Sequence, residues 1–277
     1  MICQATLREF FEQTYSPFCL TGLKETTVEQ YRVALNHLER FAARDVAVTE
    51  LGDQLVSGLM ANLFSQGRSP ATCNKTRAHL LALWRFARTG PGNHLLTDQP
   101  EVRRLKQPRR LPRAWPAEDL QAILNAASKS EGWICAAPAS LWWTALVWTL
   151  WETGLRIRAT MQLQWDGLDR RRMTLFVAAE EQKQYADQLL AISPRLLHQL
   201  DAIRRYNWPD QTARGDIFAW PFDKQRKQYR TLGRHYRKLL QRAGMPNTKT
   251  DLFHKLRKTN ASYMKLGGGD PTFQLGH

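Results

Sequence analysis

A basic, proline-containing segment in the middle of the chain most constrains how this sequence can fold. Residues 101–114 contain few apolar side chains and two prolines, Pro108 and Pro112, a composition typical of an extended linker. We therefore expect two domains, over residues 1–100 and 115–277, joined by an extended linker. The cations of that linker are Arg103, Arg104, Lys106, Arg109, Arg110 and Arg113.

The first hundred residues are predicted to form four short amphipathic helices packed as a small bundle. Thr26, with Glu29 three residues later, has the spacing of a capping box at a helix start. Ser69 followed by Pro70 is typical of another helix start, and Gly90 of its end. The remaining helices are predicted over Leu7–Tyr15 and Thr49–Phe64. The first long apolar face is formed by Val28, Tyr31, Leu35, Leu38 and Phe41.

The second half of the chain changes from helical to alternating apolar spacing and back again. Met173, Leu175 and Val177 alternate with their neighbours, and an apolar run at Leu190–Ile192 follows a polar turn, which predicts a small antiparallel sheet. The four tryptophans between Trp142 and Trp151 lie in a mostly apolar run, so we expect them in the core. Helices are predicted from Pro116 through Leu124, over Pro138–Glu152, from Gly154 to Leu163, from Ser193-Pro194 and over Asp223–Ala243.

The net charge narrows the class of partner. The chain carries +15 at pH 7, with a pI near 10.0, which favours a polyanion. Nucleic acid is the first candidate and an anionic membrane surface the second; a merely basic protein is the plainer interpretation. No secretory signal or membrane span is expected. The cysteines Cys3, Cys19, Cys73 and Cys135 are scattered and lack zinc-site spacing, so we expect reduced thiols in a cytoplasmic, nucleoid-associated protein.

Five residues are candidates for a functional site, although each has an ordinary structural explanation when taken alone. Arg156 follows a Thr-Gly turn, and Lys183 lies at the tip of the predicted hairpin. His254 and Arg257 are three apart and share a helical face, and His277 closes the chain in QLGH. A single His-x-x-Arg occurs often by chance, and a lone hairpin lysine is usually just solvated. Their joint order and local contexts are more informative than any one of them.

In that order and context, the sequence resembles the tyrosine recombinases of the phage-integrase family. TGLRIRATMQLQWDGLD is similar to the first arginine box, EEQKQYADQLLAIS to the lysine hairpin, FHKLRKTNASY to the His-x-x-Arg box and QLGH to the Leu-Gly-His box. TVEQYRVALNHLERF and SPATCNKTRAHLLALWRFA resemble the core-binding domain. The resemblance implies a mainly α protein with a small antiparallel β-sheet, in which a four-helix SAM-like core-binding domain precedes a mixed α/β catalytic domain.

The resemblance also implies site-specific DNA recombination or integration without a metal or other cofactor. Attack on a phosphodiester builds negative charge on phosphorus, which two arginines can clamp; these would be Arg156 and Arg257. Lys183 would protonate the leaving 5′-oxygen, and His254 would take the tyrosine proton or bond a phosphate oxygen. His277 would be a further phosphate donor. The linker cations would contact the DNA backbone: Arg103, Arg104, Lys106, Arg109 and Arg110.

Two departures from the family pattern affect the expected activity. The nucleophilic tyrosine, which forms a 3′-phosphotyrosyl intermediate, follows the Leu-Gly-His box in the family, whereas this chain ends at His277. We therefore expect a catalytic domain that is truncated at its C-terminus and does not cleave DNA, with Tyr263 a packing residue rather than a substitute nucleophile. The family also has an acidic residue where this chain has Ala159.

Three hypotheses about function follow. The first is a recombinase or integrase of a mobile element that binds double-stranded DNA, with homo-tetramers as the active form in the family and no membrane partner. The second is a non-catalytic DNA-binding remnant of such an enzyme. The third is an RNA-binding or generic basic protein, for which the boxes would be coincidental and Arg156→Ala would remove only one charge from binding.

Overall fold

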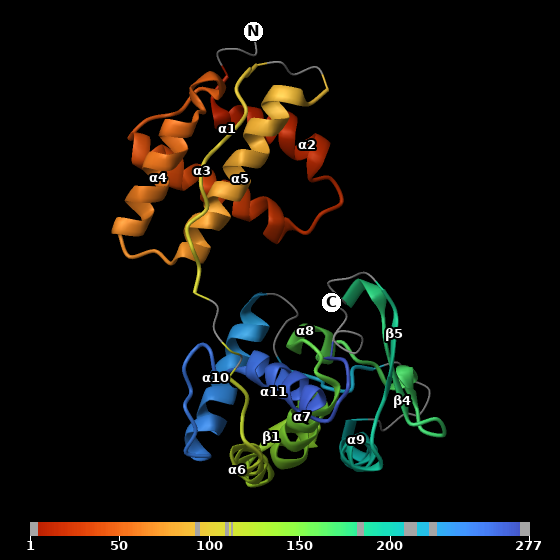
Figure 1. Ribbon diagram of the computed structural model, residues 1–277. Coiled ribbons are helices and arrows are strands. Elements are labelled where there is room, and N and C mark those ends of the chain that lie inside the picture. Colours follow the sequence, from red (N-terminus) through yellow and green to blue (C-terminus); the bar gives the residue numbers. More distant parts are fainter. Residues whose placement is uncertain are drawn as a thin grey trace. The chain divides into compact units, whose positions relative to one another are not determined.

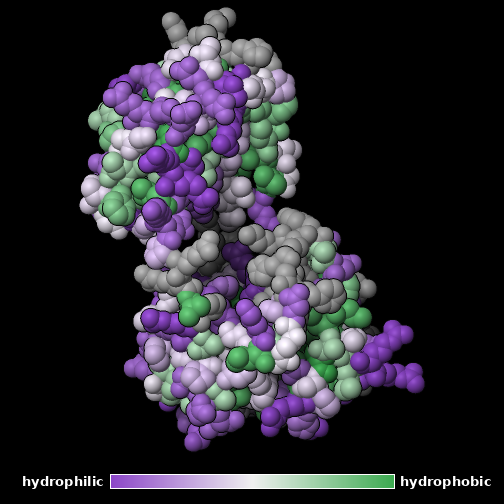
Figure 2. Space-filling model, viewed as in Figure 1, coloured by the Kyte–Doolittle hydropathy of each residue, from purple (hydrophilic) through white to green (hydrophobic). Residues whose placement is uncertain are grey.

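The chain folds into two compact units, residues 1–110 and 111–277, each with its own hydrophobic core (Figure 1). The computed structural model describes residues 5–91, 95–108, 111, 113–181, 186–207, 215–221 and 226–271. Figure 2 shows hydrophilic side chains over much of one face of each unit, with hydrophobic ones interspersed, as is usual for protein surfaces. Within the described residues, no helix is long and apolar enough to cross a membrane.

Unit 1 is a helical bundle whose longest members, α3 and α5, pack against each other and against α4. Its core includes Phe11, Leu35, Leu38 and Trp84, which are all nearly inaccessible to solvent. The elements are α1 (Leu7–Phe10), a π-helical turn (Phe11–Tyr15), α2 (Ser16–Cys19), α3 (Glu25–Ala42), a 3₁₀ turn (Val48–Glu50), α4 (Asp53–Ser65) and α5 (Pro70–Thr89).

The helix ends of unit 1 agree with the sequence prediction at both ends of α5, where Ser69 and Gly90 are the caps, and correct it at the starts of α3 and α4. Ser69 caps α5 through its hydroxyl, which accepts from the Thr72 backbone N–H at 3.2 Å, and Pro70 opens the helix as predicted. The capping box predicted at Thr26 is wrong, because α3 already begins at Glu25 and Thr26 lies inside it. Likewise, α4 begins at Asp53 rather than Thr49, since the preceding residues form a 3₁₀ turn.

The first part of the basic segment is extended but is not a free tether. Asn74 of α5 bonds both backbone groups of Leu105, accepting from its N–H and donating to its carbonyl at 2.9 Å each. Arg77 donates through Nε to the Val102 carbonyl at 2.7 Å, and Val102 itself is buried. These bonds hold the segment against α5 as far as Leu105, which lies beyond residue 100, where the first domain was predicted to end.

Unit 2 is built around α7 (Ala139–Thr153), which packs against α6 (Ala117–Ser128), α9 (Pro194–Asn207) and α11 (Phe253–Leu266). A helix that is apolar on every side must be enclosed, and α7 buries Trp142, Trp143, Leu146 and Leu150. The prediction that these tryptophans belong to the core is confirmed for Trp142 and Trp143, whereas Trp148 and Trp151 are only partly buried. Helix α10 (Arg226–Arg242) completes the helical layer.

Two small antiparallel sheets complete unit 2. One pairs β1 (Trp133–Ile134) with β2 (Ala137–Pro138), and the other has the order β3 (Leu168–Asp169), β4 (Thr174–Val177), β5 (Gln188–Ala191). In β4, Leu175 and Val177 are buried as their alternation predicts, but Met173 is exposed and lies in the preceding turn with φ 51°. The helix predicted from Gly154 to Leu163 is limited to α8 (Ile157–Thr160). The described elements thus confirm a mainly α fold with small antiparallel sheets.

Candidate functional site: two arginines and a histidine at the end of helix α7

The end of α7 positions the first candidate arginine. Gly154 caps this helix in the left-handed conformation, φ 64°, which a side-chain-bearing residue adopts only at a cost. Two residues later, Arg156 has an extended backbone (φ −73°, ψ 142°) and is the N-cap residue of α8. The Thr-Gly turn in the sequence is therefore what places Arg156 at the C-terminal end of α7.

Helix α11 brings the second arginine to the same place. Arg257 is buried, and its Nη1 donates to the Gly154 carbonyl at 2.5 Å. Three residues on, and thus on the same helical face, Asn260 donates through Nδ2 to the Glu152 carbonyl at 3.0 Å. These two bonds satisfy carbonyl groups at the end of α7 that have no partner within that helix. They also fix the rotation of α11 about its axis.

The charge of Arg156 contributes to lowering the pKa of both Arg257 and His254, so these three groups lie within electrostatic range of one another. Burial and the nearby charge of Arg156 lower the pKa of Arg257 to about 10. The pKa of His254 is also lowered, first by partial burial and then by Lys258, Arg257 and Arg156. Because the ordinary value is about 6.5, His254 is neutral at pH 7 and can accept a proton.

The other predicted site residues have different outcomes. Lys183 and His277, and the linker residues Arg109 and Arg110, lie outside the residues that the structure describes. Ala159, which stands where the family has an acidic residue, is buried in the core of unit 2. Four described linker cations are exposed: Arg103, Arg104, Lys106 and Arg113.

A buried lysine beside the site was missed by the sequence analysis. Lys255 lies between His254 and Arg257 in the sequence but points into the protein, with its Nζ 3.3 Å from the ring centroid of Trp115 and 3.1 Å from Asp251 Oδ1. The Trp115 backbone N–H donates to Thr259 Oγ1 at 2.8 Å, so the start of unit 2 is fastened to α11. The i, i+4 spacing of Asp251, Lys255 and Thr259 was a visible signal for a shared helical face.

Glu152 connects this region to the next helix. Its carboxylate accepts from the Ser193 backbone N–H at 2.5 Å and from the Ser193 hydroxyl at 2.7 Å. Ser193 in turn caps α9 by accepting from the Leu196 N–H. The last turn of α7 is therefore held by two elements that are distant in sequence, α9 through Glu152 and α11 through Arg257.

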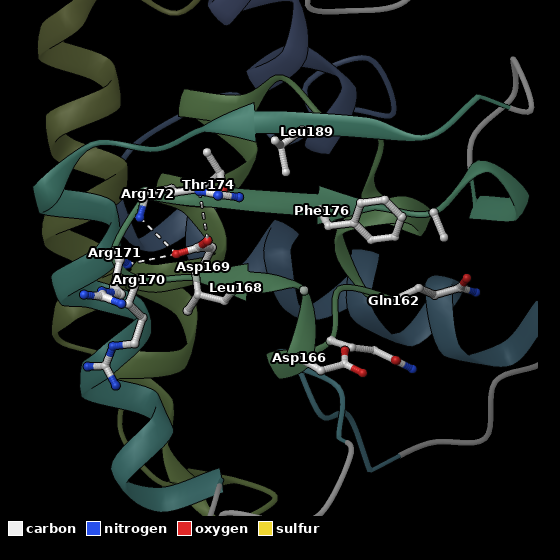
Figure 3. A pocket seen from close by; sticks show the side chains of 13 residues that line it. Gln162, Asp166, Leu168, Asp169, Arg170, Arg171, Arg172, Thr174, Phe176 and Leu189 are labelled. Carbon is white, nitrogen blue, oxygen red and sulfur yellow. Dashed lines mark hydrogen bonds and ion pairs between the residues drawn. The ribbon is translucent and has the colours of Figure 1, made fainter.

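A separate hollow lies over the three-stranded sheet (Figure 3). It measures about 800 Å³ and includes Phe176, Leu189 and three successive arginines at the β3–β4 turn. Arg170 pairs with Asp201 at 2.6 Å, and Asp169 accepts from the backbone N–H groups of Arg171 and Arg172. Arg156, His254 and Arg257 do not line it, so this hollow is separate from the candidate site.

Comparison with known proteins shows the family to which the chain belongs. A family model described as the phage integrase family matches residues 114–274, which is more than half of the chain. The chain belongs to the phage integrase family. Membership of this family of tyrosine recombinases implies a role in DNA recombination. No curated protein matches the chain.

Solved structures similar to this chain are also integrases. A lambda integrase tetramer bound to a Holliday junction is 17% identical, with 99% of this chain and 75% of that chain covered and a TM-score of 0.72. The Tn1549 transposon integrase in complex with transposon right end DNA is 15% identical, with 99% and 91% covered and a TM-score of 0.75. A lambda integrase dimer bound to a COC′ core site is 18% identical, with 99% and 95% covered and a TM-score of 0.71. At such identities these likenesses show the fold, and they confirm the predicted tyrosine-recombinase fold class.

No candidate metal centre accompanies the arginines. Within the described residues, no three His, Cys, Asp or Glu side chains are grouped so that they could hold a metal ion.

Proposed function

We propose that this integrase binds duplex DNA and holds one backbone phosphate between Arg156 and Arg257, with His254 beside it. The observation that carries the proposal is the position of Arg257, which is buried, fixed on the Gly154 carbonyl and close to a second cation. Two like charges held together cost free energy. A bound phosphate removes that cost, because its oxygens accept from both guanidinium groups.

The chemistry of the proposed site follows from these positions. Negative charge grows on the non-bridging phosphate oxygens as a nucleophile attacks, and preoriented donors stabilise that charge without reorganising. His254 is neutral and takes the proton of the attacking hydroxyl. Lys183, carried over from the family resemblance, protonates the leaving 5′-oxygen, and His277 adds a phosphate donor. The product is the family's 3′-phosphotyrosyl link, which conserves the energy of the bond for rejoining.

Three described tyrosines of unit 2, Tyr229, Tyr236 and Tyr263, are poor candidates for the attacking residue. Tyr236 is fully buried, and burial raises its pKa. Tyr263 follows His254 by nine residues, which places it on about the opposite side of α11. The Tyr229 ring lies 5.1 Å from the Arg158 guanidinium carbon, and Tyr229 is partly buried. We therefore propose that the 277-residue polypeptide binds DNA but forms no phosphotyrosyl bond.

Orthovanadate, which adopts the shape of a phosphate under attack, tests the arginine clamp directly. We expect it to raise the unfolding temperature of the full chain, and Arg156→Ala or Arg257→Ala to abolish that rise. Arg171→Ala removes one exposed charge from the distant β3–β4 turn and serves as the matched control. Equal losses in all three variants would show that vanadate binds by charge alone and would overturn the proposed site.

A second experiment tests the nucleophile. The 277-residue polypeptide and a version extended through the downstream reading frame would each be incubated with nicked duplexes of randomised sequence. We expect a detergent-resistant protein–DNA adduct only with the extended version. An adduct with the 277-residue polypeptide would contradict the proposal, and mass spectrometry of the linked peptide would identify the tyrosine, with Tyr229→Phe as the first variant to examine.

A non-catalytic DNA-binding role is the second candidate function, and one observation favours it. Ala159 leaves the site without the carboxylate that supports the first arginine in the family, and its burial leaves no room for a larger side chain to enter without displacing its neighbours. If the extended polypeptide binds DNA with the same salt dependence but forms no adduct, the non-catalytic role is the correct one.

A further inference from the structure

The opposite end of α7 carries a second concave surface that the DNA-directed site does not use. This hollow, of about 560 Å³, lies between the end of α6, the β1–β2 hairpin, the start of α7 and one face of α10. We call it the tryptophan pocket after the three tryptophans that line it: Trp133, Trp143 and Trp220. Trp143 and Gly154 are separated by 11 residues of α7, or roughly 16 Å along the helix, so the pocket is distinct from the arginine site.

The floor of the tryptophan pocket is aromatic and its wall is partly open. Trp143 is buried and Trp220 partly so, and their rings meet edge to face at 6.2 Å. Trp133 is 66% exposed, with its ring supported by Tyr206 at 6.0 Å. A tryptophan this exposed beside a hollow is unusual for a surface that only faces water, and tryptophans of this kind dominate the energetics of protein interfaces.

The rim of the tryptophan pocket is cationic. His235, Lys238 and Arg242 are spaced i, i+3 and i+7 along α10, so they form one row about 10 Å long. All three are exposed, and Glu131 is the single acidic residue that lines the hollow. Arg242 donates to Ser130 Oγ at 3.0 Å across one end, which fixes its position on the rim. Within the described residues, no ion pair involves Lys238 or Arg242.

We propose that the tryptophan pocket is a docking site for an acidic segment of a partner protein, in which one aromatic or branched aliphatic side chain enters the hollow and flanking carboxylates meet the α10 cations. Charge complementarity identifies the occupant. The row of three cations on α10, beside a single acidic lining residue, Glu131, favours an occupant that carries carboxylates. Single-stranded nucleic acid requires exposed ring faces in series for its bases, whereas here Trp143 and Trp220 pack edge to face and only Trp133 is largely exposed.

The probe for this proposal is a fluorescent peptide with a central Trp-Leu pair flanked by Asp and Glu. The matched control peptide keeps the acidic residues and replaces Trp-Leu with Ser-Ser, because a strongly basic protein binds any acidic peptide to some extent. With the full chain we expect the Trp-Leu peptide to bind about tenfold more tightly than the control, which corresponds to about 1.4 kcal/mol.

Variants of the chain locate the binding surface. Trp133→Ala is expected to remove the tenfold preference, and Lys238→Glu to weaken both peptides, while Arg171→Glu makes the same charge change outside the pocket and should weaken neither by more than about twofold. Trp133 is mostly exposed, so its replacement should leave the circular dichroism spectrum and unfolding temperature unchanged. Equal affinities for the two peptides, or a preference that survives Trp133→Ala, would overturn the proposal.

The same variants separate this proposal from the proposed function. Trp133→Ala and Lys238→Glu should retain the orthovanadate response, whereas Arg257→Ala should lose it and retain the peptide preference. If Trp133→Ala instead dissociates a self-associated form in sedimentation without altering peptide binding, the occupant is a second copy and the acidic-partner assignment is wrong. If oligothymidylate displaces the Trp-Leu peptide and its own binding depends on Trp133, the pocket binds nucleic acid and the assignment is equally wrong.

Discussion

Lys255 and Arg257 on α11 are buried, whereas Arg103, Arg104 and Lys106 on the extended segment are exposed. The α11 cations are held by a carboxylate, an indole ring and a backbone carbonyl, so each has one position and can act on one atom. In the exposed group the backbone, rather than the side chains, is held, through Val102 and Leu105. Positively charged side chains thus act as positioned hydrogen-bond donors on α11, whereas on the extended segment they contribute only positive charge.

Removing the buried Lys255 should cause the largest loss in the free energy of unfolding. Lys255→Met keeps most of the volume but leaves Asp251 without its cation, and breaking a buried pair costs about 3–5 kcal/mol. Tryptophan fluorescence in urea measures the free energy of unfolding of unit 2, because of the ten tryptophans only Trp84 lies in unit 1. Lys265→Met, at an exposed position on the same helix, should cost less than about 0.5 kcal/mol. Equal losses would show that Lys255 contributes nothing through burial.

Removing the exposed cations should affect binding and leave stability unchanged. The triple change of Arg103, Arg104 and Lys106 to Gln is expected to weaken duplex DNA binding about a hundredfold at physiological salt and to reduce the slope of log affinity against log salt by about three. The unfolding free energy should change by less than about 0.5 kcal/mol. A changed affinity for only some DNA sequences would show that these side chains read bases rather than phosphates.

Removing the backbone anchor of the extended segment should lower the free energy of unfolding more than removing its exposed charges does. Asn74→Ala removes both bonds to Leu105 and leaves buried backbone groups without partners, at a cost of about 1–3 kcal/mol to unit 1. Hydrogen exchange at the Leu105 amide should accelerate accordingly, while amides in the middle of α3 should be less affected. Unchanged exchange at Leu105 would contradict the assignment of this segment to unit 1.

The smallest expected effect concerns His254. Its pKa is lowered in the folded protein by partial burial, Lys258, Arg257 and Arg156, so below about pH 6.5 the unfolded chain binds more protons than the folded one. Stability therefore falls as pH decreases from the ordinary histidine pKa to the lowered one. Denaturation of wild type and His254→Gln across this range should show a slightly shallower fall for the variant. NMR titration of the His254 ring should also show its pKa rising when orthovanadate binds.

The parts of the fold that could be predicted are those set by local chemistry. Ser69-Pro70 and Ser193-Pro194 fixed two helix starts, and the alternation through Leu175 and Val177 indicated the sheet. The capping box at Thr26 failed because the same residue spacing also occurs inside a helix. The helix after Gly154 stopped early because Leu163 instead pairs with a distant segment, its carbonyl accepting from the Ile217 N–H at 2.7 Å.

The candidate site, too, could be predicted only where local sequence chemistry determines it. The order of Arg156, His254 and Arg257 in the sequence indicated a shared role, but the bond from Arg257 to Gly154 joins residues 103 apart and has no local signature. Lys255 was overlooked because lysines are rarely buried. Its partner Trp115 lies 140 positions earlier, just past the basic segment, where nothing in the sequence indicates a contact with α11.

The anchoring of Leu105 on α5 has a consequence for how the two units reach a common target. Among the described residues, the last backbone anchor of unit 1 is Leu105 and the first of unit 2 is Trp115, held by Thr259, so the joint has nine residues, 106–114, and ten Cα–Cα steps. Fully extended, they span no more than about 33–36 Å. For two units that bind one duplex, a joint this short makes the second binding event intramolecular, at an effective concentration on the order of millimolar. Removing the Asn74 bonds would lengthen the joint and lower the effective concentration for the second binding event, although none of the residues proposed to contact DNA would have changed.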